Sequence, residues 1–593
     1  MAIAGWPRSA VNFANFCIHY GVALDTNNRL WSFGTVTKCL IENREPGMKN
    51  RSVQQTAEKK NGIFEPIIQT NEQKNFIRLD GHPAPLKLSR RLYTQLCPPS
   101  VIDAETLELI QVLLLHTTID HTVSMTGSAV LLRSLIQPST DLVYIRSKQE
   151  ALEEIASNEK LRQALQDFVY EFSKGEKALY KFFNKDLYAL FPYRDLKKAR
   201  QSAANMVKAM RTIPPAETSY LQRLTANLHL YEGSSIDRMM TGPIYRTFQG
   251  IKSAKAVGFF TPKQKFIPHR FSKWLAAGPA VALSPYIYNM LEFGPSLSPL
   301  MSIIGLVWTG LYVFYGLIVK PVQDTGNFIE PLRERCVHDP TFSLALDTVG
   351  MIDELLAGHR FAAQLQHTAV LPKVTDETHH SFEAAGLKNP ILVKEKPECV
   401  PNDVQMRGTR LSFISGPNSG GKTTICKSIV QNQLLAQMGS YVLAERATIN
   451  IADMIRYQAP KFDGLQDDEG RFGTELGRTR DIFYATSPRS LVILDELAEG
   501  TTYEERLHES FGILSDFHTI GNNTVLVTHN HSLVDRFMAE EKGQCLMAEF
   551  NGDDPTYRII PGISRVSHAG RITKKINFSQ EDRHRHMQEK GYL

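Results

Sequence analysis

A glycine-rich segment of nine residues has the composition and spacing of a phosphate-binding loop. It contains the P-loop pattern, a glycine followed by four residues and then Gly-Lys-Thr. Glycines let the backbone curl so that successive N–H groups point at phosphate oxygens, while lysine suits the β- and γ-phosphates and threonine suits Mg²⁺. The predicted nucleotide-binding residues are Gly416, Pro417, Asn418, Ser419, Gly420, Gly421, Lys422, Thr423 and Thr424, with Thr423 also a metal ligand.

The flanks of this segment favour the strand, turn and helix that the motif requires. The apolar run Leu411 to Ile414 predicts a buried strand before the loop, and Thr424 to Met438 predicts a helix after it. The N-terminus of such a helix adds a partial positive charge that favours phosphate. We therefore expect ATP and Mg²⁺ as ligands.

Two further strands end in side chains that could act on a bound phosphate. Leu491 to Leu494 predicts a buried parallel strand, followed by Asp495, which could hold Mg²⁺, and Glu496, which could polarise a water. Val525 to Val527 predicts another strand, and His529 follows it after Thr528. Because open α/β sheets bind ligands at the carboxyl ends of their strands, we predict Asp495 as a metal ligand and Glu496 and His529 as catalytic residues. The alternative for His529 is a structural role.

These motifs resemble those of the MutS family of ATPases, which are relatives of ABC ATPases. Besides the P-loop, Val-Pro-Asn-Asp at residues 400–403, the Asp-Glu to Gly-Thr run at 495–502 and Thr-His at 528–529 are similar to family motifs. The likeness covers most of residues 120–260, loosely, and of residues 326–575, strongly. It implies an α/β P-loop domain of the ABC type at the C-terminus and an all-α core or lever domain.

The resemblance also implies a homodimer through the ATPase domains, in which a signature loop of the partner completes each ATP site. The matching residues here are Gly470, Arg471, Phe472 and Glu475. Gly470 and Arg471 stand where Ser and Thr are usual in the family, so the hydroxyl is missing. Either Arg471 replaces it as a cation acting in trans, or Arg471 is a solvated loop residue.

A long uncharged stretch predicts membrane insertion. Leu297 to Val319 holds 23 residues without a charge, which as a helix would span roughly 34 Å, more than the ~30 Å hydrocarbon core. Trp274 to Leu291 is a second uncharged stretch, and basic residues flank the pair. We expect two transmembrane helices within residues 274–319 and both soluble parts on the cytoplasmic face of a membrane. The alternatives are a buried core hairpin and a soluble cytoplasmic protein.

Length and composition are those of a folded protein with several domains. The chain has 593 residues and a net charge of +5, which does not demand nucleic acid, and its seven cysteines form no CxxC pair, which argues against zinc and disulfides. We expect no cleaved signal peptide. The predicted domains are an N-terminal region of unknown fold at 1–102, a helical MutS-like core at 103–262, a transmembrane hairpin at 263–325, a helical core return at 326–380 and a MutS-type ATPase domain at 381–593.

Two classes of function follow from these features. The family likeness favours an ATPase that binds DNA, in mismatch repair or the recognition of DNA structures. The mismatch-reading domain of the family carries Phe-x-Glu, whereas Phe64 and Glu65 are adjacent here, so we expect that domain to be absent. This absence and the apolar stretch favour the second class, a membrane-anchored mechanical ATPase acting on a protein or membrane partner. A basic cluster within residues 194–211 could meet DNA, but such a run is more often a solvated helix face.

Overall fold

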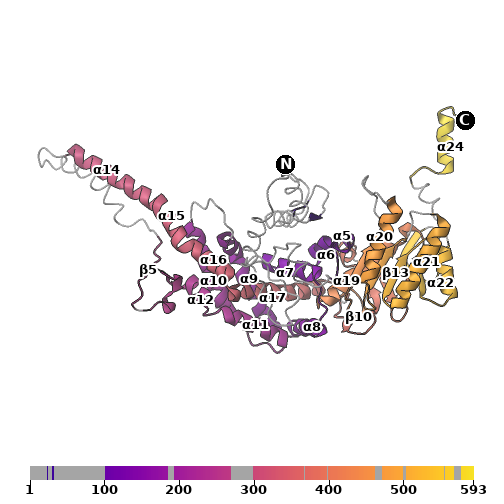
Figure 1. Cartoon of the computed structure of the whole chain (residues 1–593), viewed down its shortest axis with the longest axis horizontal. Helices are drawn as coiled ribbons and strands as arrows, with labels where there is room; N and C mark the ends of the chain where they lie inside the picture. The colour runs from indigo at the N-terminus through magenta and orange to yellow at the C-terminus, as the bar shows by residue number, and fades with distance from the viewer. Residues whose placement is uncertain are drawn as a thin grey trace, which may run out of the picture.

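The protein is elongated, with a helical region and an α/β region arranged end to end in a computed structural model (Figure 1). The structure describes residues 101–183, 192–258, 260–268, 298–365, 368–396, 398–460, 470–497, 502–552, 554–565 and 576–592, together with the short antiparallel strands β1 (Ala23–Leu24) and β2 (Leu30–Trp31). The N-terminal region predicted at 1–102 therefore lies almost wholly outside the described residues.

The helix α17 (Pro340–Gln364) forms the centre of the helical region. It is buried over most of its length, as its apolar side chains from Phe342 to Phe361 require, and its most extensive contacts are with four other helices. These are α7 (Met125–Ile136), α8 (Leu142–Ser157), α9 (Glu159–Phe183) and α11 (Ser219–Tyr231). The remaining helices around this core are α10 (Pro192–Met210), α12 (Ser235–Thr241) and α16 (Glu330–His338).

Two local features of this region carry little sequence signal. The helices α8 and α9 are separated at Asn158, whose backbone is extended and whose Oδ1 atom accepts a hydrogen bond from the Leu161 N–H at 3.0 Å. Asn favours such capping positions because its side chain competes for backbone N–H groups. A small antiparallel sheet that was not expected also occurs, with the order β4 (Gly250–Ser253), β3 (Ile244–Thr247) and β5 (Gln264–Lys265).

The α/β region is built on a six-stranded sheet. Its strands, in spatial order, are β11 (Ile455–Gln458), β12 (Leu491–Asp495), β13 (Asn523–Val527), β9 (Leu411–Ser415), β14 (Gln544–Asn551) and β15 (Asp554–Pro561). All neighbours pair in parallel except β14 and β15, so β15 is an antiparallel edge strand. The associated helices are α19 (Lys422–Gln437), α20 (Gly470–Ala485), α21 (Tyr503–Ile520) and α22 (His531–Ala539). Because the connections are parallel crossovers, the ends of β9, β12 and β13 meet at one edge.

A second sheet and two short helices complete this region. The sheet has the order β6 (Lys373–Thr375), β10 (Arg446–Asn450), β7 (Phe382–Leu387) and β8 (Asn402–Gln405). The helices α5 (Ala104–Leu109) and α6 (Val112–Ile119) precede the helical region in sequence but share the apolar core of the α/β region. The Tyr457 N–H donates to Thr106 Oγ1 at 2.9 Å, which ties α5 to β11. The α/β region therefore includes residues from the predicted helical core.

The prediction of two transmembrane helices is wrong for the described part of the chain. The helix α14 (Ser298–Phe314) has 17 residues, which at 1.5 Å per residue is about 25 Å and shorter than the bilayer core. A π-helical turn at Tyr315–Val319 then interrupts it before α15 (Lys320–Asp324). Among the described helices, none combines the length and apolar character needed to cross a membrane. The other predicted span, Trp274 to Leu291, lies outside the described residues.

Candidate nucleotide-binding site

The glycine-rich loop connects β9 to α19, as the motif requires. Gly416 and Gly421 have φ angles of +125° and +90°, a backbone region that L side chains rarely adopt. A Cβ atom on Gly420 would lie 2.5 Å from the Cβ of Ala548. The loop therefore needs glycine at all three positions, either for its backbone angles or for its close approach to β14.

Lys422 is the first residue of α19 and lies almost fully buried beneath the loop, with 3 % of its surface exposed. Its Nζ atom donates a hydrogen bond to the Gly416 carbonyl oxygen at 2.6 Å. Burial lowers the pKa of the Lys422 ammonium, and the negative charges of Asp495 and Glu496 oppose that shift. The Lys422 ammonium is thus held against the loop backbone, where the negative charges of Asp495 and Glu496 stabilise it.

Thr423 meets Asp495 across the strand ends. The Thr423 Oγ1 atom donates to Asp495 Oδ2 at 3.1 Å, and the hydroxyl of Tyr457 donates to the same oxygen at 3.4 Å. Burial raises the pKa of the Asp495 carboxyl, while the Thr423 hydrogen bond and the Lys422 charge lower it. A hydroxyl and a carboxylate side by side are hard oxygen donors of the kind that Mg²⁺ prefers.

Glu496 follows Asp495 in a strained backbone conformation, with φ at +70°. Its N–H donates to the Val527 carbonyl at 2.9 Å, which fixes the turn to the end of β13. The Glu496 Oε1 atom lies 3.7 Å from Nε2 of His529. The structure therefore brings the predicted base and the predicted histidine together at the edge where Asp495 and Thr423 meet.

The remaining predicted loop residues line the same turn. Pro417 precedes a short 3₁₀ turn at Asn418–Gly420, Ser419 is exposed and Thr424 is half-buried in the first turn of α19. The residues present fit a nucleotide and Mg²⁺, because the loop lacks side chains that would obstruct its backbone and its lysine and oxygen donors converge.

The predicted signature loop lies at the start of α20, which begins at Gly470. Phe472 packs against the apolar core between the six-stranded sheet and its helices. The carbonyl oxygen of Glu475 accepts from Thr479 Oγ1 at 3.1 Å within the helix. The side-chain placement of Arg471 lies outside the described residues, so its trans role stays a prediction.

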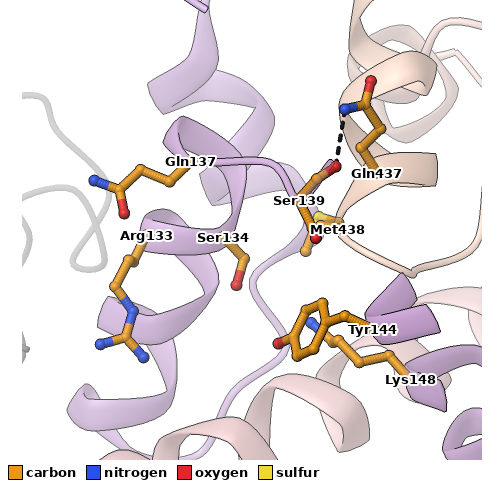
Figure 2. Close-up of a pocket in the computed structure, with 8 residues that line it drawn as sticks. All are labelled: Arg133, Ser134, Gln137, Ser139, Tyr144, Lys148, Gln437 and Met438. Carbon is orange, nitrogen blue, oxygen red and sulfur yellow. Dashed lines mark hydrogen bonds between the residues drawn. The ribbon is translucent and has the colours of Figure 1, made fainter. Parts of the chain in front are cut away.

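Sequence reasoning missed the buried amide groups along α19, which link the P-loop to the helical region. Gln437, the last residue of α19, donates through Nε2 to the Ser139 carbonyl at 2.9 Å, and the Ser139 N–H donates back to the Gln437 carbonyl at 3.2 Å (Figure 2). Gln431 donates to the Ile110 carbonyl at 2.9 Å. A fully buried amide side chain is costly unless it is hydrogen-bonded. The run of consecutive amide residues in this buried helix could therefore have predicted polar contacts with a neighbouring part of the protein.

A polar pocket lies beside this junction, between α19 and the helices α7 and α8. Figure 2 shows Lys148 and Tyr144 on one side and Arg133 and Gln137 on the other. Lys148 is buried and pairs with the buried Glu354 of α17 at 3.0 Å. The C-terminal end of α19 therefore lies beside α7 and α8, the helices that pack against α17.

Comparison with known proteins agrees with this geometry. Residues 412–578 match the family profile of MutS domain V. The chain is 30 % identical over 267 residues to the DNA mismatch repair protein MutS of Myxococcus xanthus, covering 43 % of this chain and 30 % of that protein. It is 33 % identical over 169 residues to the DNA mismatch repair protein MSH3 of Kluyveromyces lactis, covering 28 % of this chain and 16 % of that protein.

A longer match extends into the helical region. The chain is 25 % identical over 463 residues to the DNA mismatch repair protein MutS of Thermosynechococcus vestitus, covering 70 % of this chain and 51 % of that protein. In all three comparisons the match spans about half or less of the relative's length. The chain is therefore similar to MutS proteins over domain V and, at lower identity, over part of the helical region.

Proposed function

We propose that this chain is a Mg²⁺-dependent ATPase of the MutS type that couples nucleotide turnover to movement of its helical region and acts on DNA. The contact between Thr423 and Asp495, with Lys422 and Glu496 at the same strand ends, carries the proposal. These are the parts that phosphoryl transfer to water requires: a phosphate cradle, a cation, metal ligands and a base.

In the proposed reaction, the loop N–H groups and Lys422 bind the phosphates. Thr423 and Asp495 would hold a Mg²⁺ ion, which would neutralise phosphate charge. Glu496 accepts a proton from water as the water oxygen bonds to the γ-phosphorus and the bond to the bridging oxygen breaks, which yields ADP and phosphate. His529, 3.7 Å from Glu496, is available to orient the base or contact the γ-phosphate.

Coupling to the helical region is supported by the course of α19. Its N-terminal end carries Lys422 and Thr423, and its C-terminal end bonds to Ser139, between α7 and α8. A shift of α19 on nucleotide binding must move that junction, since packed interfaces transmit rather than absorb displacement. In the proposed cycle, two ATPase domains close on each other as a homodimer, and the helical regions swing with them.

Action on DNA is supported by the relatives, which are named DNA mismatch repair proteins. The basic cluster on α10 adds little to this support. Arg200 donates to the Met240 carbonyl at 2.6 Å, and Arg211 pairs with Glu232 at 2.6 Å, so both are used within the chain. Lys197 and Lys198 are exposed on the same helix.

The test is the ATPase rate of the purified full-length chain with Mg²⁺, measured alone and with homoduplex, mismatched and branched DNA at 50 and 200 mM salt. We expect hydrolysis that requires Mg²⁺, and a rate that changes with one DNA structure and less so at high salt, because DNA binding weakens steeply with salt. Absence of hydrolysis under all conditions would contradict the ATPase assignment. Hydrolysis that no DNA alters, without DNA binding at low salt, would remove DNA from the proposal.

A further inference from the structure

A second pocket lies behind Glu496, on the side of α21 and α22. It is lined by Glu496, Arg506, Ser510, Thr528, His529 and Asn530, with leucine side chains forming the rest of the wall. Neither Arg506 nor Asn530 belongs to the P-loop, the metal ligands or the predicted catalytic pair. Both carry N–H donors, and both reach the pocket that the Glu496 side chain lines.

The amide of Asn530 has a fixed orientation. Asn530 caps the N-terminus of α22, where its Oδ1 atom accepts a hydrogen bond from the Leu533 N–H at 3.1 Å, and its own N–H donates to Thr528 Oγ1 at 3.0 Å. Because the cap requires the oxygen, the NH₂ group must face the other way. Asn530 is 93 % buried, and among the described residues no atom accepts from its Nδ2.

Arg506 supplies a second donor from α21. Its Nε atom is buried and has no acceptor within the described part of the chain, although the residue as a whole is half-buried. Its guanidinium lies over the ring of Tyr503, with 5.7 Å from Cζ to the ring centroid. Two buried donors, Arg506 Nε and Asn530 Nδ2, thus lack an acceptor among the described residues, and buried donors are rarely left unsatisfied.

The Glu496 carboxylate is the negatively charged group of this pocket. Its Oε1 atom is 3.7 Å from His529 Nε2, beyond hydrogen-bonding distance. Lys422 and Asp495 lie on the P-loop side of Glu496. His529, in the turn after β13, and Arg506, on α21, line the pocket on its other side. Asn530 and Arg506 are the pocket residues with N–H donors that the proposed reaction does not use.

We propose that Asn530 and Arg506 are positioning residues that donate, directly or through one water, to the Glu496 carboxylate and hold it in line with the attacking water. This inference rests on the proposed function, with Glu496 as the base. It assigns the two residues a role in kcat and none in nucleotide binding, because no residue of the glycine-rich loop lines the pocket that they share with Glu496. A misplaced base costs rate even when substrate binds normally.

The test separates the donor from the helix cap. Asn530→Ser and Asn530→Asp keep a side-chain oxygen for the cap but remove the NH₂ group, and Arg506→Met removes the second donor while keeping most of the apolar stem. We expect each to lower kcat by about tenfold or more, with KM and the nucleotide Kd unchanged, as for an interaction used only in the transition state. The matched control is Arg489→Met, whose Nε is also buried without a described partner but which pairs with Asp376 away from the pocket.

A double-mutant cycle decides whether the effect passes through Glu496. In a Glu496→Gln background, measured in single turnovers with enzyme in excess, Asn530→Ser should lower the residual rate by less than about twofold, because the group that it positions is gone. Unchanged kcat in all three variants, or the same loss with and without Glu496, would overturn the inference. Failure of the wild-type chain to hydrolyse ATP would overturn the proposed function as well, so the two failures are distinguishable.

Discussion

Thr423 and Asp495 are 72 residues apart in the chain, yet the Thr423 hydroxyl donates to Asp495 Oδ2 at 3.1 Å. This contact joins the first turn of the P-loop helix to the end of β12 and defines the proposed metal site. Thr423→Val keeps the shape of the side chain but removes the oxygen ligand, so we expect Mg²⁺-dependent turnover to fall by about a hundredfold. Steady-state kinetics against Mg²⁺ concentration would measure this loss.

The control for this substitution is Thr423→Ser, which retains the hydroxyl and should keep turnover within about threefold of wild type. Thermal unfolding of both variants should match wild type, because the Thr423 side chain is exposed. Equal activity of the valine and serine variants would show that this hydroxyl does not bind the metal.

Substitutions of Glu496 and Lys422 should have different effects, the first on the rate of hydrolysis and the second on nucleotide affinity. Glu496→Gln keeps the shape of the base but cannot take a proton, so nucleotide affinity should hold while kcat falls by about 10²- to 10⁴-fold. Lys422→Ala removes a charge-assisted contact worth about 1.5–3 kcal/mol and should weaken nucleotide binding by about tenfold or more. Equilibrium binding of a fluorescent ATP analogue and single-turnover hydrolysis distinguish the two. If Glu496→Gln turned over ATP at the wild-type rate, another base would have to be sought.

The candidate nucleotide-binding site was predictable from the sequence because its residues lie at the ends of apolar strands. Leu411 to Ile414 and Leu491 to Leu494 are short, mostly apolar runs typical of buried strands, and parallel pairing then brings their carboxyl ends together. The approach of Thr423 to Asp495 follows from that topology. By contrast, the pocket residue Arg506 has no local sequence signal, since only the packing of α21 against β13 turns it inward.

The apolar stretch from Leu297 to Val319 was misread because composition does not report where a helix ends. Hydropathy describes the side chains alone. The π-helical turn at Tyr315–Val319 is a change in the backbone hydrogen-bond pattern, which the amino-acid composition does not determine. The break between α8 and α9 at Asn158 is hard to predict for a related reason. Its effect depends on one side chain capping the next helix at Leu161, which periodicity does not detect.

Glycines at the junction of α17 and α7 should be essential for packing. A Cβ atom on Gly350 would lie 2.5 Å from Cγ2 of Val130 and 3.0 Å from the Thr126 carbonyl oxygen. Gly350→Ala should therefore destabilise the protein by about 1–3 kcal/mol despite the better helix propensity of alanine. Gly512→Ala is the matched change in α21. Its new Cβ meets no atom of the described residues within 4 Å, so the substitution should stabilise the protein by up to about 1 kcal/mol. Calorimetric unfolding that ranks Gly350→Ala at or above wild type would refute the close packing.

His380 should make stability depend on pH. Burial lowers the pKa of its imidazole to about 4, although the hydrogen bond to Gln433 opposes the shift. The Asn523 amide donates to Nδ1 at 3.0 Å, so Nε2 carries the proton in the neutral ring and faces Gln433 Oε1 at 3.3 Å. Between pH 6.5 and about 4, the unfolded chain binds a proton at this residue and the folded chain does not. Stability should therefore fall as the pH drops through this window.

The size of the effect is set by linkage, about 1.4 kcal/mol per pH unit below the unfolded pKa, or about 2 kcal/mol between pH 6.5 and 5. Other groups also titrate there, so the informative quantity is the difference from His380→Asn, which retains an acceptor and a donor but does not titrate. That variant should be less stable than wild type at pH 7 yet lose less stability towards pH 5. Urea unfolding curves at pH 7, 6 and 5 would measure both slopes, and parallel slopes would mean that His380 is protonated in the folded protein already at pH 5.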